Sequence, residues 1–302
     1  MSCILVPVDY TLICHNAYRY ALHLAEEMGL DVVLAHYYSG SIDPRAPLVL
    51  TGDGTIQGSH EERLRQFAYA SAEEPSYPLL EPPCNVKVTY EVALSLQPAA
   101  AIIRRASADD IRLVVLPPRS SGSLLGKWLG STATTVSEVC RRPVYLVPPE
   151  ARYQSPLRNL VVADNGDTDQ YPLRQLEALL LTHGARLHFV HVERPGKELA
   201  LRYTAEPLLE DLLEAEQDAE FPFEVVTVED DDVSRGLLDY ADDIRADLLV
   251  VINQTRSRWR AILRATLTQD LALRSQLPVL VLHRTDVGSV DTYSSIHTAT
   301  KS

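Results

Sequence analysis

The chain has 302 residues, of which 46% are hydrophobic and 23% are charged, with 13 Gly and 19 Pro. This composition is typical of a globular protein and excludes the collagen-like, disordered and disulfide-scaffold classes. The 28 Lys and Arg residues are outnumbered by 41 Asp and Glu residues, and the net charge of −13 disfavours binding to a phosphate backbone or an anionic membrane. We therefore expect neither nucleic acid nor a membrane as a partner.

The amino terminus, MSCILVPVDY, lacks the basic region and long apolar stretch of a secretion signal. No segment reaches the roughly 20 apolar residues that a membrane helix needs. Together these features predict a cytoplasmic protein. The four cysteines share no metal-ligand spacing, so we expect no metal site and reduced, mostly buried thiols at Cys3, Cys14, Cys84 and Cys140.

The predicted elements occur twice along the chain. A first offset of 155 residues separates three pairs of equivalent residues: Asp9 and Asp164, Gly29 and Gly184, His36 and His191. A second offset of 135 residues separates the apolar runs that start at Leu113 and Leu248, and those that start at Pro143 and Pro278. Because 155 exceeds 135 by 20, the first copy carries 20 additional residues between His36 and Leu113.

Within each copy, short apolar runs alternate with helical patterns. The helical patterns cover residues 16–29, 98–110 and 131–142 in the first copy, and 172–184, 233–246 and 265–276 in the second. We expect the first of them to stop at Gly29 and the third to have Ser131 as its N-cap. Apolar runs without strict alternation are typical of strands buried on both faces. The sequence therefore predicts a doubly wound α/β fold with a parallel sheet in each copy.

The additional residues of the first copy fall in a stretch rich in turn-forming residues. They place an insertion at about 38–82, with a helix around 61–72. This insertion is either a surface excursion or a mobile flap over the strand ends. The expected domains cover residues 1–150 and 156–284, followed by a disordered polar tail at 285–302.

The position of a binding site follows from the fold. In an open parallel sheet, ligands bind at the carboxyl ends of the strands, where the strand order reverses. The glycines of the loop 117–131 let the backbone bend where side chains would clash, and the helix that follows offers free N–H groups to a phosphate. The candidate nucleotide-binding residues are Pro7, Val8, Asp9, Pro117, Ser120, Gly122, Gly126, Gly130, Ser131 and Thr132. The alternative is a glycine-containing turn into a capped helix.

Asp9 has a specific expected role at this site, because its carboxylate can accept a hydrogen bond from a ribose hydroxyl or an adenine amino group. In the second copy, the equivalent loop, 253–266, has no glycine. It carries four arginines that are candidates for anion binding: Arg256, Arg258, Arg260 and Arg264. The alternative is that these arginines pair with the acidic run 229–232 or face water.

The tandem arrangement, the opening ILVPVD, the strand with His36, the LGST helix start and the RRPVYLVP strand resemble the universal stress protein family. The resemblance covers nearly the whole chain. It implies two Rossmann-like domains of the adenine nucleotide alpha hydrolase type, each with a five-stranded parallel sheet of order 3-2-1-4-5. It further implies that the domains pair through their last strands, 144–147 and 279–282, into an internal pseudo-dimer, with a homodimer as a further option.

Nucleotide-binding members of this family carry the loop G-x2-G-x9-G-[S/T]. Counting back from Gly130 without gaps puts Ser120 and Pro117 where the two earlier glycines belong, so only the last part of the motif matches. The resemblance implies a non-enzymatic stress-response or signalling module that requires no cofactor. Its first domain is a candidate for binding ATP with magnesium, or another adenine nucleotide.

Two alternatives remain open at this point. One is a slow nucleotide hydrolase or nucleotidyl transferase on the same fold, for which Asp9 and Lys127 are candidates by position, although no catalytic residue is assigned. The other is a structural interaction protein in which both sites are vestigial. The sequence does not identify a protein partner for any of these functions.

Overall fold

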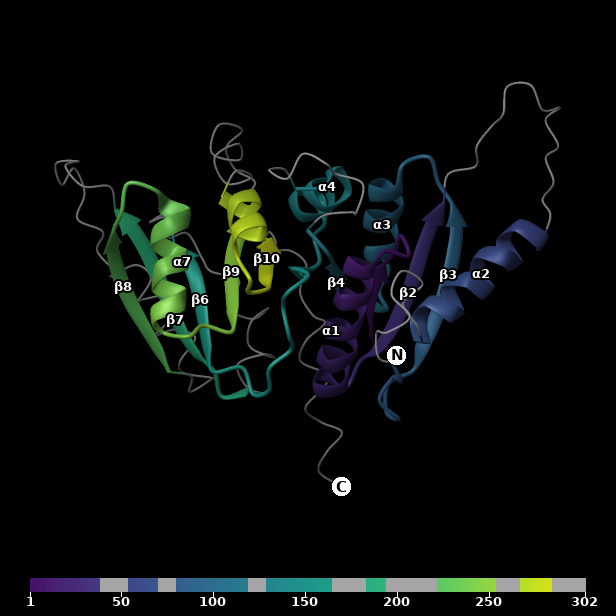
Figure 1. Cartoon of the computed structure of the whole chain (residues 1–302), viewed down its shortest axis with the longest axis horizontal. Coiled ribbons are helices and arrows are strands. Elements are labelled where there is room, and N and C mark those ends of the chain that lie inside the picture. Colours follow the sequence, from purple (N-terminus) through teal and green to yellow (C-terminus); the bar gives the residue numbers. More distant parts are fainter. Residues whose placement is uncertain are drawn as a thin grey trace. The chain divides into compact units, whose positions relative to one another are not determined.

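A computed structural model describes residues 1–38, 54–69, 80–118, 129–164, 183–193, 222–253 and 267–283; for residues 54–56 and 164 it describes the backbone alone. The chain divides into two compact units (Figure 1). The first unit comprises Met1–Tyr153 together with Gln269–Val279, and the second comprises the remaining residues. Two domains are thus present, as the repeat predicts, while the expected tail at 285–302 lies outside the described residues.

The first unit is a parallel sheet with connecting helices. Its elements are β1 (Cys3–Pro7), α1 (Leu12–Met28), β2 (Asp31–Tyr38), α2 (Gly54–Tyr69), β3 (Val88–Leu94), α3 (Pro98–Ala106), β4 (Ile111–Leu116), α4 (Ser131–Val139) and β5 (Val144–Leu146). The strand order is β3-β2-β1-β4-β5. In the register, Leu5 of β1 lies opposite Val33 of β2 on one side and Val114 of β4 on the other.

The second copy in the sequence repeats this arrangement. Its described elements are β6 (Asn159–Asp164), β7 (Arg186–Glu193), β8 (Phe223–Glu229), α7 (Val233–Asp243), β9 (Leu248–Asn253) and β10 (Val279–His283), with a further helix at 267–274. Of this copy, Gln269–Val279 belongs to the first compact unit. The strand order is β8-β7-β6-β9-β10. Counted along each copy, both units have the order 3-2-1-4-5, which confirms the predicted fold class.

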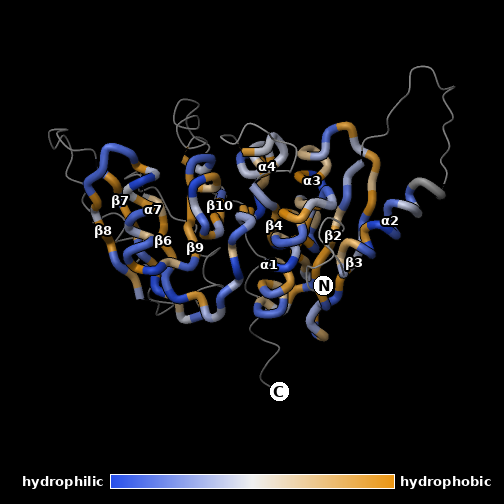
Figure 2. Tube along the Cα trace, in the orientation of Figure 1, coloured by the Kyte–Doolittle hydropathy of each residue, from blue (hydrophilic) through white to orange (hydrophobic). Residues whose placement is uncertain are grey.

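The core is built mainly from the strands. All five residues of β1 and of β10 are buried, and Figure 2 shows hydrophobic residues along β4 and β9. Burial on both faces explains why these segments lack the polar-apolar alternation of a half-exposed strand. The cysteines are free, and Cys3, Cys14 and Cys140 are buried while Cys84 is exposed, as expected for reduced structural thiols. None of the described helices is long and apolar enough to cross a membrane.

The helix ends show which local predictions were correct. Helix α1 begins after Thr11, whose hydroxyl accepts a hydrogen bond from the N–H of Cys14. It ends at Gly29 with φ of 62°, the left-handed conformation that favours glycine, as predicted. Helix α4 has Gly130 as its N-cap, and Ser131 is its first helical residue. The prediction of Ser131 as the N-cap is therefore wrong by one position.

The additional residues of the first copy lie between β2 and β3. The starts of β2 and β7, at 31 and 186, are 155 residues apart, whereas the starts of β3 and β8, at 88 and 223, are 135 apart. Helix α2 occupies this stretch and covers 54–69 rather than the expected 61–72. Its residues Leu64, Phe67 and Ala68 are buried, so α2 belongs to the core. The segments 39–53 and 70–79, on which the flap interpretation depends, lie outside the described residues.

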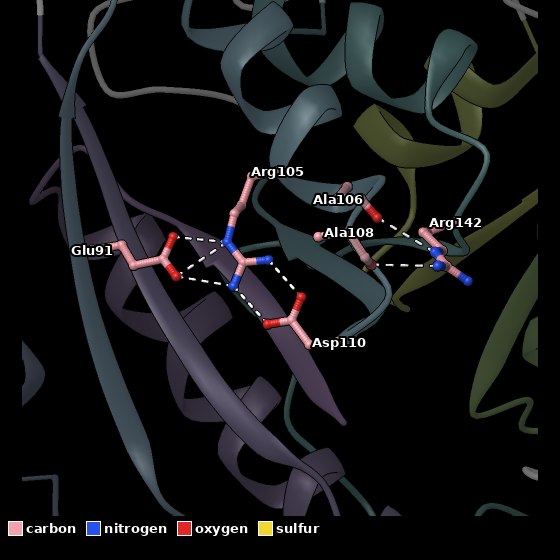
Figure 3. Close-up of polar contacts among 6 residues, drawn as sticks. All are labelled: Glu91, Arg105, Ala106, Ala108, Asp110 and Arg142. Atoms are coloured by element: carbon pink, nitrogen blue, oxygen red, sulfur yellow. Dashed lines mark hydrogen bonds and ion pairs between the residues drawn. The ribbon is translucent and has the colours of Figure 1, made fainter. Parts of the chain in front are cut away.

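An ion-pair network fixes α3 against the sheet (Figure 3). The guanidinium of Arg105 binds both carboxylate oxygens of Glu91 on β3 and both of Asp110, which precedes β4, at 2.8 to 3.1 Å. These hydrogen bonds lower the pKa of Asp110 and raise that of Arg105. Because both pairs are bidentate, they orient α3 as well as anchoring it.

Candidate functional site

The predicted site lies at the carboxyl ends of β1 and β4, which are neighbours in the sheet of the first unit. The strand order reverses here, because β2 lies on one side of β1 and β4 on the other. The N–H of Gly130 donates a hydrogen bond to the carbonyl oxygen of Pro118 at 2.9 Å. This bond holds the start of α4 against the chain that leaves β4.

The fold thus brings together the predicted nucleotide-binding residues that the structure describes, which are seven of the ten. Pro7 ends β1, Val8 and Asp9 follow it, Pro117 follows β4, and Gly130, Ser131 and Thr132 form the start of α4. The remaining candidates, Ser120, Gly122 and Gly126, lie outside the described residues. Pro117 is buried and has no N–H to donate, so the end of β4 offers a ligand one donor fewer than a glycine there would.

The start of α4 carries no capping side chain from the described residues. Ser131 is exposed and Thr132 is half-buried, so both can be reached from solvent. Gly130 has φ of −59° and ψ of 142°, a backbone conformation that any residue can adopt. The backbone conformation alone therefore does not require glycine at this position. What glycine provides is an N-cap without a side chain, so no side chain of the cap residue itself occupies the first N–H groups of α4, which are the groups that bind an anion at a helix start.

Asp9 is exposed, but one of its carboxylate oxygens is already engaged. Its Oδ1 accepts hydrogen bonds from the N–H of Thr11 at 3.2 Å, from the hydroxyl of Thr11 at 2.6 Å and from the thiol of Cys14 at 3.0 Å. Burial and the nearby Asp9 carboxylate raise the pKa of Cys14, which keeps it a protonated donor rather than a nucleophile. The predicted contact of Asp9 with a ribose or a base is therefore left to Oδ2.

The backbone N–H and carbonyl oxygen of Val8, between β1 and Asp9, both have hydrogen-bond partners within the first unit. The N–H of Val8 donates to the carbonyl oxygen of Ala35, and the carbonyl oxygen of Val8 accepts from Nδ1 of His36, both at 2.8 Å. His36, near the end of β2, is thereby tied to the backbone that follows β1. Burial lowers the pKa of His36, with a smaller contribution from nearby cations, so the ring is neutral at physiological pH.

A group of aromatic rings beside the site was missed by the sequence interpretation. This aromatic cluster consists of Tyr10, His36, Tyr38, His60 and Phe67. Tyr10 has φ of 68°, an uncommon conformation for a non-glycine residue, and its ring centroid lies 4.2 Å from that of His36. The helix was expected to begin at 61, which left His60 outside it. Three aromatic side chains near two strand ends, Tyr10, Tyr37 and Tyr38, were the available sequence signal.

In the second unit, much of the expected site lies outside the described residues. Asp164 ends β6 and is paired with His191 of β7 in the register. All four arginines of the loop 253–266 are outside the description, so their pairing with the acidic run stays a prediction. Two residues of that run have partners nearby: Asp230 binds Nε of Arg235 at 2.9 Å, and Asp232 caps α7.

Among the residues whose side chains the structure describes, no group of three or more His, Cys, Asp and Glu could hold a metal ion. Lys127, one of the two residues considered for nucleotide hydrolysis, lies outside the description. The other, Asp9, has one carboxylate oxygen engaged by the turn that leads into α1.

Two repeated α/β units with a site at the strand-order reversal define the doubly wound class of nucleotide-binding folds. A family model described as the universal stress protein family matches residues 1–148 and again residues 157–283. The chain therefore belongs to the universal stress protein family and carries two of its domains.

Solved structures agree with this assignment at the level of the fold. A universal stress protein from Archaeoglobus fulgidus DSM 4304 is 15% identical, with a TM-score of 0.64, over 94% of this chain and 98% of that one. A putative universal stress protein from Pseudomonas aeruginosa UCBPP-PA14 is 13% identical, with a TM-score of 0.56, over 94% and 93%. No functionally curated protein matches the sequence.

Proposed function

We propose that this protein is a non-enzymatic stress-response or signalling module whose first domain binds an adenine nucleotide. Support comes from the start of α4, where Gly130 provides an N-cap without a side chain and is tied to Pro118 at the strand-order reversal. The partial positive charge of the helix start and its free N–H groups favour a phosphate at this point.

The phosphate end of the ligand is proposed to bind the N–H groups of the first turn of α4 and the hydroxyls of Ser131 and Thr132. The ribose or base is proposed to contact Oδ2 of Asp9. The chain of hydrogen bonds through Thr11 and Cys14 orients this carboxylate without a ligand, so binding costs little reorganisation at that end.

A non-enzymatic role fits the chemistry of the groups next to Asp9. The thiol of Cys14 is protonated and donates to the carboxylate, and His36 donates to a carbonyl oxygen, so neither is poised to activate water.

In the second domain we propose anion binding by the arginine loop 256–264. The internal pseudo-dimer, a further homodimer, the domain limits 1–150 and 156–284 and the cytoplasmic location stay predictions.

Thermal unfolding with ATP, ADP and AMP, each with magnesium, tests nucleotide binding. A ligand present at 100 times its dissociation constant stabilises the folded protein by about 2.7 kcal/mol. The variant Gly130→Val tests the site, because its backbone conformation accepts valine while the side chain covers the N–H groups of α4. The matched control is Val139→Ala, an exposed position at the other end of the same helix.

We expect ATP to stabilise the wild type and the control, and to leave Gly130→Val unchanged. An absence of stabilisation at millimolar ATP in the wild type would contradict nucleotide binding and favour an interaction protein with vestigial sites. Equal stabilisation of all three proteins would move the site away from α4.

For the second domain, replacing Arg256, Arg258 and Arg260 with Gln should weaken phosphate binding, and an unaltered affinity would favour a solvated loop.

A further inference from the structure

The imidazole of His60, on α2, is stacked within the aromatic cluster. Its ring centroid lies 4.2 Å from that of Tyr38, at an interplanar angle of 18°, and 5.3 Å from that of His36, at 29°. The hydroxyl of Tyr10 donates to the carbonyl oxygen of His60 at 3.2 Å. The His60 imidazole, a planar nitrogen heterocycle, is thus stacked on rings at the end of β2, and its backbone is bound by Tyr10 from the turn after β1.

This stack lies at the carboxyl ends of β1 and β2, while the start of α4 is tied to the end of β4. The three strands are consecutive in the sheet, in the order β2-β1-β4. Two strand spacings amount to about 10 Å. A nucleotide with its phosphate at α4 would thus reach across the end of β1 and place its base at the position of the His60 ring.

The burial of α2 is uneven along its length. Leu64 and Ala68 are fully buried and Phe67 is 2% exposed, so the second half of the helix is anchored in the core. Residues 57–59 are exposed and His60 is half-buried, so among the described side chains of the first half it is the His60 ring that stacks against the sheet. A ligand that takes the place of this ring would have to displace the first half of α2, whose described side chains are less buried than those of the second half.

One ring nitrogen of His60 lacks a hydrogen bond within the aromatic cluster. Its Nδ1 is buried and has no hydrogen-bond partner among the described residues. A buried polar atom without a partner costs free energy, and the cost is relieved when the ring moves to solvent. At Nδ1 the ring thus lacks the hydrogen bond that a buried polar atom of a core residue usually has.

We propose that His60 is a self-ligand: its imidazole occupies the place of a nucleobase in the first domain, and an incoming base displaces it together with the first half of α2. This inference rests on the proposed nucleotide site and adds its regulation. The base stacks on Tyr38 and His36 in place of the imidazole. Because the vacant state is only a fraction of the population, the apparent affinity for nucleotide is reduced by that fraction.

Two variants of His60 separate competition from simple packing. His60→Ala vacates the stack, whereas the matched control His60→Phe keeps it filled by a ring. The probe is free adenine, which has no phosphate and so does not depend on α4. We expect calorimetry to show that His60→Ala binds adenine at least tenfold more tightly than the wild type, and that His60→Phe binds no more tightly. Equal adenine affinity in the two variants, or none in either, overturns the inference.

A measurement on the unaltered protein removes the dependence on how His60→Ala folds. Hydrogen exchange of residues 57–63 is compared without ligand, with inorganic pyrophosphate, and with ATP at a concentration that raises the unfolding temperature. We expect ATP to speed exchange in this segment and pyrophosphate to leave it unchanged. Unchanged or slower exchange with bound ATP overturns the proposal that His60 is a self-ligand, and it leaves the proposed nucleotide site unaffected. Tight adenine binding by His60→Ala without any ATP binding supports the self-ligand and refutes the phosphate site.

Discussion

Acid should destabilise the first domain through His15, a buried residue of α1. Its side chain is 1% exposed, and its ring packs edge-on against Phe67 at 5.2 Å and Tyr18 at 6.5 Å between centroids. Burial lowers the pKa of His15 from 6.5 to about 4, and the nearby Arg19 contributes in the same direction. The folded protein therefore holds this imidazole in its neutral form well below the pH at which the unfolded chain protonates it.

The sign and size of the effect follow from this difference in pKa. Since the pKa is lower in the folded state, the contribution of His15 to stability is complete above about pH 6.5 and is lost as the pH falls toward 4. Each pKa unit corresponds to about 1.4 kcal/mol, so the whole shift is equivalent to about 3 kcal/mol. At pH 5, about 2 kcal/mol of this has been lost.

Urea unfolding followed by circular dichroism measures this loss at pH 7 and pH 5. The variant His15→Gln does not titrate, and the matched control His23→Gln removes an exposed histidine from the same helix. Burial also lowers the pKa of His36 and of His188, so the comparison between proteins isolates His15. We expect wild type and control to lose about 2 kcal/mol more than His15→Gln between the two pH values. Parallel pH profiles for all three proteins would refute the reasoning.

Two further substitutions probe what orients the helices. Arg105→Met leaves the carboxylates of Glu91 and Asp110 without their partner, and we expect the free energy of unfolding in urea to fall by about 1.5 to 3 kcal/mol, the range for hydrogen bonds to charged groups; an unchanged midpoint would show that the network is not stabilising. Asp232→Ala removes the N-cap of α7, and faster hydrogen exchange in this helix with a loss of about 1 kcal/mol is expected. Protection equal to the wild type would assign the start of α7 to packing alone.

The fold could be predicted from the sequence because its determinants are local and occur twice. Apolar runs without alternation identified strands buried on both faces, and Gly29 marked the end of α1 by a conformation that favours glycine. The duplication gave independent support, since Asp9 lies two residues after β1 and its equivalent Asp164 is the last residue of β6. The order of the strands and helices therefore followed from the periodicity of apolar residues and from the constant offsets between the two copies.

The details of the site could not be predicted in the same way, because they depend on contacts between distant segments. The stacking of His60 on Tyr38 requires the sheet register and the position of α2 against the sheet, which the helical spacing of Leu64, Phe67 and Ala68 does not determine. The positive φ of Tyr10 has no composition signal either, since glycine or asparagine is the usual residue in that conformation. The predicted N-cap, Ser131, was one residue away from the observed N-cap, Gly130, because serine is the commoner residue at this position.

The two copies diverge at the positions that matter for a ligand. With the offset of 155, Tyr38 corresponds to Glu193, and with the offset of 135, Gly130 corresponds to Ala265. The second copy thus lacks both the ring on which a base would stack and the glycine that leaves a helix start uncovered. Since both features occur only in the first copy, we expect one nucleotide per chain in calorimetric titrations. A stoichiometry of two would contradict this assignment and require the second domain to bind nucleotide by different contacts.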